Sequence, residues 1–488
     1  MKRFSVLTGV LTGITAGLIV GFGASTFAAE QEHAWSFQGI NLLPTSENAY
    51  GSRAACDHVE GLKTNFGINS VVTRQYLVLP SYEDSTIDKK DFVQDEQIQK
   101  QLRIDQALGV KSVLSVGIKL KTDMDANSKP SQSSIEFATV DEYDHFFSEY
   151  QSHLLKYATM LRKDGNVGIF SIGNDLTSLT LTKRLKNAEA IQTYFSTVTW
   201  DKVNKLIRFK ASLAQHGATA LPLSTSWFQW VKDGVLNTLL DKDHHRDLAE
   251  LRSWSASNGR AALSANAKSY VVDLENSRRT YLKAMWVQTI QKVRDEFSNV
   301  PDQKRPVLTY NADYQIADQV DFWRDLDQIS VSTYLQLGSD HSVHALEGEW
   351  TESLKGFDQF VRAMDPPKKV VFSELVADKF PSDPEAHANA IEALNHVVAQ
   401  GSVPWLDGIL FWDSYVGKSR SLSGSYGNGT CQRIFLKKVT YTEPAVAAPT
   451  PAVKPAPSAP QNSNDSNDPN AHKPTTEEQF EKLKDLLF

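Results

Sequence analysis

Short apolar runs of β-forming residues alternate with helical patterns along most of the chain, and this alternation limits the fold more than any other feature. Runs that are apolar on both faces indicate strands buried on both sides, as in a parallel sheet. Strands are expected at residues 37–43, 68–79, 111–118, 167–173, 307–310, 328–334, 369–373 and 408–412. Helices are expected between them at residues 51–66, 95–108, 140–161, 281–297, 351–364 and 385–400. This α/β order predicts a closed (β/α)8 TIM barrel rather than an open sheet.

The regular alternation is interrupted after the fourth expected strand. From about residue 183 to residue 280 the pattern is mostly helical, with an aromatic-rich piece that contains Trp227 and Trp230. Barrels of this kind carry their functional groups at the carboxyl ends of the strands. The sequence therefore predicts a helical insertion on that rim, which would form a lid or a wall.

The two ends of the chain are expected to lie outside the barrel, which we assign to residues 29–440. Residues 1–28 begin with basic side chains and continue with an apolar run and a small-residue cleavage pattern. This pattern predicts a signal peptide for export to the periplasm or the extracellular space. An uncleaved membrane anchor is the alternative interpretation, because the apolar run is rather long.

The C-terminal tail has a composition that cannot form a packed core. Residues 441–474 are rich in Pro and Ala and then in Asn and Ser, which predicts a disordered linker. Residues 475–488 fit a short amphipathic helix. This helix could dock to an envelope protein, or it could be a frayed tail with no partner.

The charge and the cysteine count limit the kinds of partner. The net charge of -7 and the pI near 6.0 argue against nucleic acid, whose binding proteins normally have a basic surface. The two cysteines, Cys56 and Cys431, are either a disulfide or two buried thiols. The histidine pairs His244–His245 and His341 with His344 fit no recognised ligand set, so we predict no metal. We also predict no cofactor and a monomeric protein.

Two of the expected strands end at a carboxylate. Asp175 follows the run at 167–173, and Glu374 follows the run at 369–373. Carboxylates at the carboxyl ends of barrel strands are where such folds place their chemistry. The alternatives are a helix cap for Asp175 and a solvated strand end for Glu374.

The motifs around these carboxylates resemble those of a known group of enzymes. The motifs are GIN at residue 39, STI at 85, FSIGNDL at 170, LTYNADY at 308, VDFWRDLDQISVSTY at 320, VVFSEL at 370 and GILFW at 408. In this order they are similar to the clan A glycoside hydrolases, and most similar to the β-mannanase-like glycoside hydrolase family 113. The resemblance covers most of residues 36–415 apart from the insertion, and it implies a (β/α)8 barrel.

The resemblance also implies roles for individual residues. Glu374 matches the catalytic nucleophile, and Asp175 occupies the position of the acid/base. Asn174 matches the contact to the sugar 2-hydroxyl, Tyr334 the support of the nucleophile, and Trp412 the platform under the sugar. Further expected substrate contacts are Asn41 in the GIN motif and the aromatic side chains Trp35, Trp227 and Trp230, which could stack on a pyranose ring.

The chain departs from the family at the acid/base position. The family has Glu where this chain has Asp175, whose side chain is shorter by one carbon–carbon bond of roughly 1.5 Å. Retaining enzymes hold their carboxyl groups about 5–5.5 Å apart, and inverting enzymes about 6.5–9.5 Å. A rearranged site, a change to inversion and loss of catalysis are the three hypotheses that follow.

The resemblance thus implies an exported hydrolase of a β-linked polysaccharide or oligosaccharide, with a mannan-type glycan as the first expectation. Its two carboxylates would act by double displacement. The alternative from another class is a catalytically inactive barrel that binds a glycan or serves as a scaffold in the cell envelope.

Overall fold

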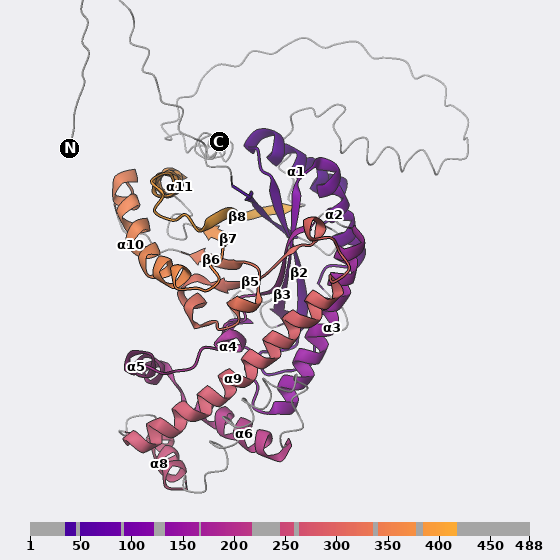
Figure 1. The fold of residues 1–488 in the computed structure, drawn as a ribbon. Helices are drawn as coiled ribbons and strands as arrows, with labels where there is room; N and C mark the ends of the chain where they lie inside the picture. Colours follow the sequence, from indigo (N-terminus) through magenta and orange to yellow (C-terminus); the bar gives the residue numbers. More distant parts are fainter. Residues whose placement is uncertain are drawn as a thin grey trace, which may run out of the picture. The chain divides into compact units, whose positions relative to one another are not determined.

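The computed structural model describes residues 35–44, 49–88, 92–121, 132–164, 167–216, 245–257, 263–334, 340–376 and 384–416. These residues belong to the compact unit that begins at Trp35. Eight parallel strands close into a barrel in the order β1 to β8 (Figure 1). The strands are β1 (Phe37–Pro44), β2 (Ser70–Leu79), β3 (Lys111–Leu120), β4 (Val167–Asn174), β5 (Val307–Asp313), β6 (Ile329–Tyr334), β7 (Val370–Val376) and β8 (Leu406–Val416). The predicted (β/α)8 barrel is therefore confirmed.

Helices connect the strands. The α-helices are α1 (Arg53–Phe66), α2 (Asp95–Leu108), α3 (Val140–Asp164), α4 (Thr177–Thr180), α5 (Ala188–Thr197), α6 (Trp200–His216), α8 (His245–Ala256), α9 (Ala265–Glu296), α10 (Val343–Arg362) and α11 (Pro384–Ala399). The short 3-10 helices are η2 (Gln132–Ser134), η4 (Asp302–Lys304), η5 (Tyr314–Gln319) and η6 (Trp323–Asp325).

Two helices begin earlier in the chain than the sequence pattern indicated. α9 begins at Ala265 rather than near residue 281, and Ser264 caps it by accepting a hydrogen bond from the amide of Ala267 at 3.2 Å. α10 begins at Val343 rather than at 351, after the cap residue Ser342. In both cases a serine cap fixes the start, while the apolar pattern becomes regular only further along the helix.

Close contact between strands depends on glycine where the barrel closes. A Cβ atom on Gly39 in β1 would lie 1.9 Å from the carbonyl oxygen of Ser70 in β2. A Cβ atom on Gly408 in β8 would lie 2.5 Å from the carbonyl oxygen of Phe37. These two glycines therefore allow β1 to approach both of its neighbours.

The interior of the barrel is filled in layers. An apolar cluster near the amino ends of the strands closes one end; it consists of Phe37, Val72, Val113, Ile169, Val371 and Leu410, with Val307 packed against it. Above it lies a layer of buried hydroxyl groups from Ser115, Ser171, Thr309, Ser330 and Ser373, which line a small internal cavity together with Arg74 and Asn311. The polar residues at the carboxyl ends of the strands follow this layer along the barrel axis.

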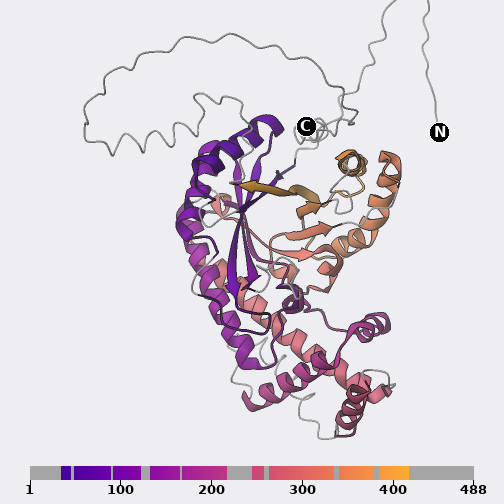
Figure 2. The same ribbon diagram turned by 180° about the vertical axis from the view of Figure 1, so that it is seen from behind.

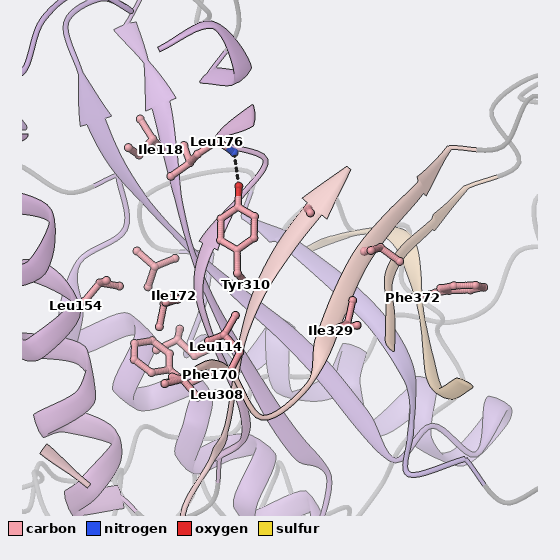
Figure 3. Packing of buried hydrophobic residues seen from close by; sticks show 14 of the residues in the cluster. Leu114, Ile118, Leu154, Phe170, Ile172, Leu176, Leu308, Tyr310, Ile329 and Phe372 are labelled. Atoms are coloured by element: carbon pink, nitrogen blue, oxygen red, sulfur yellow. Dashed lines mark hydrogen bonds between the residues drawn. The ribbon is translucent and has the colours of Figure 1, made fainter. Parts of the chain in front are cut away.

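A large apolar core separates the outer surface of the barrel from its helices (Figure 3). Trp286 of α9 is buried there, with its ring centroid 5.4 Å from that of Tyr310 and 5.2 Å from that of Phe322. Leu154 of α3 and Ile172 of β4 belong to the same cluster. The core thus fixes α3 and α9 against β4 and β5.

The insertion after β4 has a second apolar core. We call α5, α6, α8 and the first half of α9 the wing (Figures 1 and 2). The buried residues of this second core are Leu185, which precedes α5, and Tyr194, Val203, Leu206, Leu251, Trp254, Tyr270, Val271, Val272 and Leu274 of the wing. The predicted helical character of the insertion is confirmed for the described residues, and α9 runs without interruption from the wing to the barrel.

The expected signal peptide at 1–28, the linker at 441–474 and the short helix at 475–488 lie outside the described residues. Among the helices that are described, none has the length and the apolar character required to span a bilayer.

Candidate active site

The candidate site is formed by polar residues at the carboxyl ends of adjacent strands. Asn174 of β4 lies opposite Asn311 of β5, and Ser332 of β6 lies opposite Glu374 of β7. The carboxyl ends of all strands of a parallel barrel meet at one face. Asp175, directly after β4, and Glu374 are therefore brought to the same end of the barrel, as the sequence predicted.

Glu374 is almost fully buried and forms an ion pair with Arg74 of β2. Each side chain is 3% exposed, and Nη2 of Arg74 donates to Oε1 of Glu374. Burial opposes the charge of Arg74, but the nearby Glu374 carboxylate outweighs it and raises the Arg74 pKa above its ordinary value. The guanidinium group of Arg74 therefore keeps its charge, and the ion pair fixes the Glu374 side chain in place.

Asn41 of β1 holds the arginine from the other side. Its Oδ1 accepts from Nε of Arg74 at 3.1 Å and from Nη2 at 2.7 Å. Its Nδ2 donates to the carbonyl oxygens of Ser373 at 2.8 Å and Phe411 at 3.1 Å. Asn41 is fully buried, so its role in this structure is to orient Arg74 rather than to face open solvent.

Two amide side chains complete the surroundings of the Glu374 carboxylate. Nδ2 of Asn311 donates to Oε1 of Glu374 at 3.2 Å and to Oγ of Ser332 at 2.8 Å. Nδ2 of Asn311 also donates to Oδ1 of Asn174, which ties the two amide side chains together. Arg74 and Asn311 thus both donate to one oxygen of Glu374, which fixes the orientation of this side chain.

Asp175 has a different environment. Its backbone is left-handed, with φ of 53°, and its amide donates to the carbonyl oxygen of Asn311 at 2.9 Å. Burial raises the pKa of the Asp175 carboxyl to about 7, and the negative charges of Asp313 and Glu374 act in the same direction. A hydrogen bond from Oγ1 of Thr177 at 3.4 Å opposes this rise in pKa only in part.

The structure also tests the alternative that Asp175 is a helix cap. The cap residue of α4 is Leu176, and no side chain forms a capping hydrogen bond there. The amide of Leu176 instead donates to the hydroxyl oxygen of Tyr310 at 2.7 Å (Figure 3). Asp175 therefore does not cap the short helix that follows it.

The two carboxylates thus differ in the property that matters for acid–base chemistry. Glu374 is paired with a cation, whereas Asp175 is desolvated, faces other carboxylates and has a pKa near neutrality. A pair of titratable groups whose environments differ in this way can supply one ionised and one protonated carboxyl at the same pH. This is the combination that glycosidic bond cleavage requires.

The other predicted contacts are placed less completely. Tyr334 is the last residue of β6 and Trp412 lies in β8, but their side chains fall outside the described set. Trp227 and Trp230 also lie outside the described residues. Trp35 lies two residues before the start of β1, so it is near the amino ends of the strands and is not brought together with Glu374.

Cys56 is fully buried on α1 and is disulfide-bonded, whereas Cys431 lies outside the described residues, so their pairing stays a prediction. Within the described part of the chain, no group of three or more His, Cys, Asp or Glu side chains could hold a metal ion.

Sequence reasoning missed three residues of the site: Arg74, Asn311 and Asp313. A signal was present for Arg74, because it is the one charged side chain in the apolar run at 68–79. Asn311 and Asp313 lie in the motif LTYNADY, which helped to identify the barrel but was given no role in the site.

Comparisons with known proteins found similarity to one family model and to several solved structures. The model of Glycoside Hydrolase Family 113 matches residues 246–415. One similar solved structure is that of a family 113 β-1,4-mannanase complex, with 15% identity, a TM-score of 0.47, and coverage of 78% of this chain and 89% of the other. Another is the family 113 β-mannanase AaManA from Alicyclobacillus acidocaldarius, with 15% identity, a TM-score of 0.47, and coverage of 80% and 90%.

A third similar structure is a fungal β-1,4-galactanase, with 11% identity, a TM-score of 0.37, and coverage of 78% of this chain and 90% of the other. The search of curated proteins found no match. The family match covers β5 to β8 and includes Glu374, whereas Asp175 and the first four strands lie before it. The chain is a (β/α)8 barrel whose residues 246–415 resemble glycoside hydrolase family 113.

Proposed function

We propose that this protein is a glycoside hydrolase that cleaves a β-linked polysaccharide or oligosaccharide. The observation that carries the proposal is the pair of carboxyl groups at one end of the barrel, with Glu374 ion-paired and the Asp175 pKa raised to about 7. The family 113 match supports a glycoside hydrolase-like barrel acting on β-glycans. A mannan-type glycan is the first substrate to test, because the resembling family is β-mannanase-like.

In the proposed mechanism Glu374 is the nucleophile. One of its oxygens attacks the anomeric carbon while the bond to the leaving oxygen breaks and Asp175 donates its proton to that oxygen. The product of this step is a glycosyl ester on Glu374. Asp175, now ionised, takes a proton from water, the water oxygen attacks the anomeric carbon, and the ester bond to Glu374 breaks.

The residues around Glu374 prepare it for this role. Arg74 and the amide group of Asn311 donate to Oε1 and fix the orientation of the carboxylate, and Asn311 is bonded in turn to Asn174. Such an arrangement costs little reorganisation when the reaction begins, because the donors are already in place.

We further propose that the protein acts after export, on the support of the sequence of residues 1–28.

The test is hydrolysis of mannan, xylan, β-glucan and peptidoglycan fragments by the purified protein and its Glu374→Ala variant. A matched control is Glu352→Ala, because Glu352 is 77% exposed on α10. Activity that is lost in Glu374→Ala and kept in Glu352→Ala would support the proposal. NMR detection of the first product anomer would decide between retention and inversion. Absence of hydrolysis on all substrates would contradict the proposed reaction.

A second candidate function is a glycan-binding or scaffold protein of the cell envelope, which could dock to an envelope protein through residues 475–488. The observation that favours it is the burial of Glu374, because a side chain that is 3% exposed offers little surface to a substrate. Glycan binding measured by calorimetry without any hydrolysis would support this candidate.

A further inference from the structure

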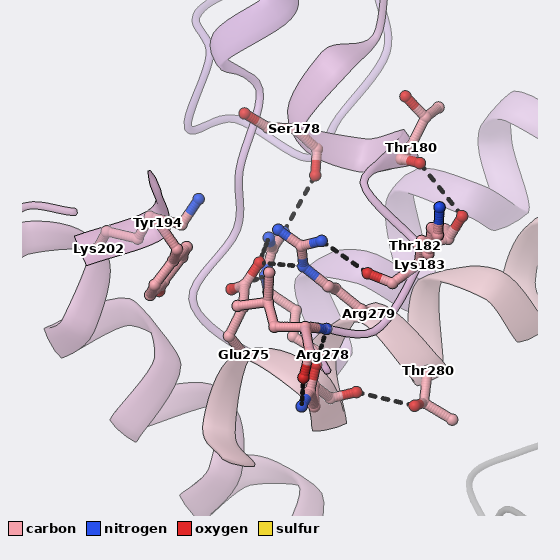
Figure 4. Close-up of polar contacts among 12 residues, drawn as sticks. Ser178, Thr180, Thr182, Lys183, Tyr194, Lys202, Glu275, Arg278, Arg279 and Thr280 are labelled. Atoms are coloured by element: carbon pink, nitrogen blue, oxygen red, sulfur yellow. Dashed lines mark hydrogen bonds and ion pairs between the residues drawn. The ribbon is translucent and has the colours of Figure 1, made fainter. Parts of the chain in front are cut away.

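A buried ionic cluster lies on α9 (Figure 4) and is made of residues that do not belong to the candidate active site. Glu275 is fully buried, and the side chains of Arg278 and Arg279 are 1% and 5% exposed. Oε1 of Glu275 accepts from Nη2 of Arg278 and from Nε of Arg279, each at 2.8 Å. Oε2 of Glu275 accepts from Nε of Arg278 at 3.1 Å. One carboxylate therefore orients both guanidinium groups.

Each guanidinium group also bonds to the chain that follows Asp175. Nη1 of Arg278 donates to the carbonyl oxygen of Ser178 at 3.0 Å, and Nη1 of Arg279 donates to the carbonyl oxygen of Lys183 at 2.7 Å (Figure 4). The cluster thus binds α4 at Ser178 and the chain that follows α4 at Lys183. The segment that carries Asp175 out of β4 is thereby attached to α9.

The charges of the cluster are balanced inside the protein. Burial alone would raise the pKa of Glu275, but the charges of Arg278, Lys202 and Arg279 outweigh it and lower this pKa to about 2. A second carboxylate, Glu136, lies 3.2 Å from Arg278. A buried ionic cluster of this kind contributes little net stability compared with apolar side chains of similar volume. Its directed hydrogen bonds, rather than its net stability, distinguish it from an apolar contact.

We infer that Glu275, Arg278 and Arg279 are positioning residues that hold the segment 176–183 against α9. They thereby keep the backbone of Asp175 in its left-handed conformation and its carboxyl group in a desolvated position. This inference rests on the proposed function, in which Asp175 is the acid/base. The residues act through backbone carbonyl groups, and the hydrogen bond from the Leu176 amide to Tyr310 holds the other end of the segment. Loosening the segment would admit water to Asp175.

The test compares Arg279→Gln with the wild-type protein. Arg279→Gln removes the charge and the hydrogen bond to Lys183, whereas Arg279→Lys keeps the charge near Glu275 and loses the forked geometry. The matched control is Arg294→Gln, because Arg294 is also an α9 arginine whose Nη2 donates to a backbone carbonyl outside α9, that of Asp325 in η6 at 2.8 Å. Thermal unfolding first shows which variants are folded.

The main measurement is the pKa of Asp175 from carboxyl carbon NMR, with the signal assigned by its loss in Asp175→Asn. The charged groups that act on Asp175 are Asp313, Glu374 and Arg74, and none of them is changed in these variants. We expect the Asp175 pKa to fall by about one unit in Arg279→Gln, by less in Arg279→Lys, and not at all in Arg294→Gln.

On a hydrolysed substrate, Arg279→Gln should lower kcat by about tenfold to a hundredfold with little change in KM. An unchanged Asp175 pKa in the folded Arg279 variants would overturn the inference. If Arg279→Gln does not fold, the shift in Arg279→Lys decides in the same way. Because the NMR measurement needs no substrate, failure of the proposed hydrolysis would leave it readable.

Discussion

At the scale of single residues, the candidate site gives its two carboxyl groups different surroundings. Glu374 lies against the guanidinium group of Arg74, and Asp175 lies among other carboxylates in a desolvated position. The sequence was sufficient to predict both carboxylates, because each follows a recognisable strand. It was not sufficient to predict Arg74, since its partner Glu374 is 300 residues away in the chain and only the closed barrel brings them together.

The raised pKa of Asp175 predicts how activity depends on pH. The acid form of Asp175 is needed for the first step, so the hydrolysis rate should fall as the pH rises through about 7. In Asp175→Asn this limb should disappear, and kcat should fall by about 10²- to 10⁴-fold because no proton can be donated. Rates measured from pH 4 to pH 9 on both proteins would check this. A wild-type rate that rises across pH 7 would contradict the assignment.

The buried ion pair predicts a large effect of removing its cation. Arg74→Met leaves the charge of Glu374 buried without its partner, so the free energy of unfolding should fall by about 3–5 kcal/mol. Arg53→Met is the control, because its ion pair with Asp57 is exposed, with 52% and 41% of the side chains accessible. The control should change stability by less than about 0.5 kcal/mol. Urea unfolding would measure both, and equal losses would contradict the argument.

At the scale of elements, the strands were predicted well and the helices around the insertion less well. A strand such as β3 has apolar residues on both faces, because both faces are buried, and this pattern is visible in a sequence. α9 was missed at its beginning because its first half buries polar residues, among them Glu275 and Arg278, together with apolar ones. A buried charge pair at helical spacing resembles an exposed one until the tertiary contacts are known.

Two glycines in different elements predict opposite effects of the same substitution. Gly39→Ala would place a methyl group 1.9 Å from the carbonyl oxygen of Ser70, so β1 could not pair closely with β2. We expect a loss of at least about 3 kcal/mol or failure to fold. A Cβ atom added at Gly356 on α10 has no atom within 4 Å, so Gly356→Ala should raise the free energy of unfolding by about 0.5–1 kcal/mol through helix propensity. Thermal and urea unfolding would measure both variants, and stabilisation by Gly39→Ala would contradict the barrel register.

At the scale of the whole molecule, stability is linked to pH through buried acids. Asp105 on α2 is fully buried, and its carboxyl accepts hydrogen bonds from Gln101 and from Ser112, each at 2.8 Å. Burial raises the Asp105 pKa to about 7 from an ordinary value of 3.8. The folded protein therefore holds a proton that the unfolded chain has released between these two pH values.

This linkage gives a measurable stability profile. Because the folded pKa of Asp105 lies above the unfolded value, its contribution is complete below about pH 4 and is lost as the pH rises toward 7. Asp105→Asn cannot ionise, so the fall in the free energy of unfolding between pH 4 and pH 7 should be smaller than in the wild type. Urea unfolding at several pH values would check this. An identical slope in both proteins would show that Asp105 titrates normally.

The continuity of α9 from the wing to the barrel has a consequence for how the insertion can vary in length. Each residue of an α-helix advances the helix by about 1.5 Å and turns it by about 100°. Removing one residue between Val272 and Glu275 would therefore turn the apolar face of the first half of α9 away from α6 and α8 while the arginines stayed in place. The orientation of the wing relative to the barrel therefore depends on the number of residues in α9. Insertions or deletions of about seven residues, which are close to two full turns, would keep that orientation.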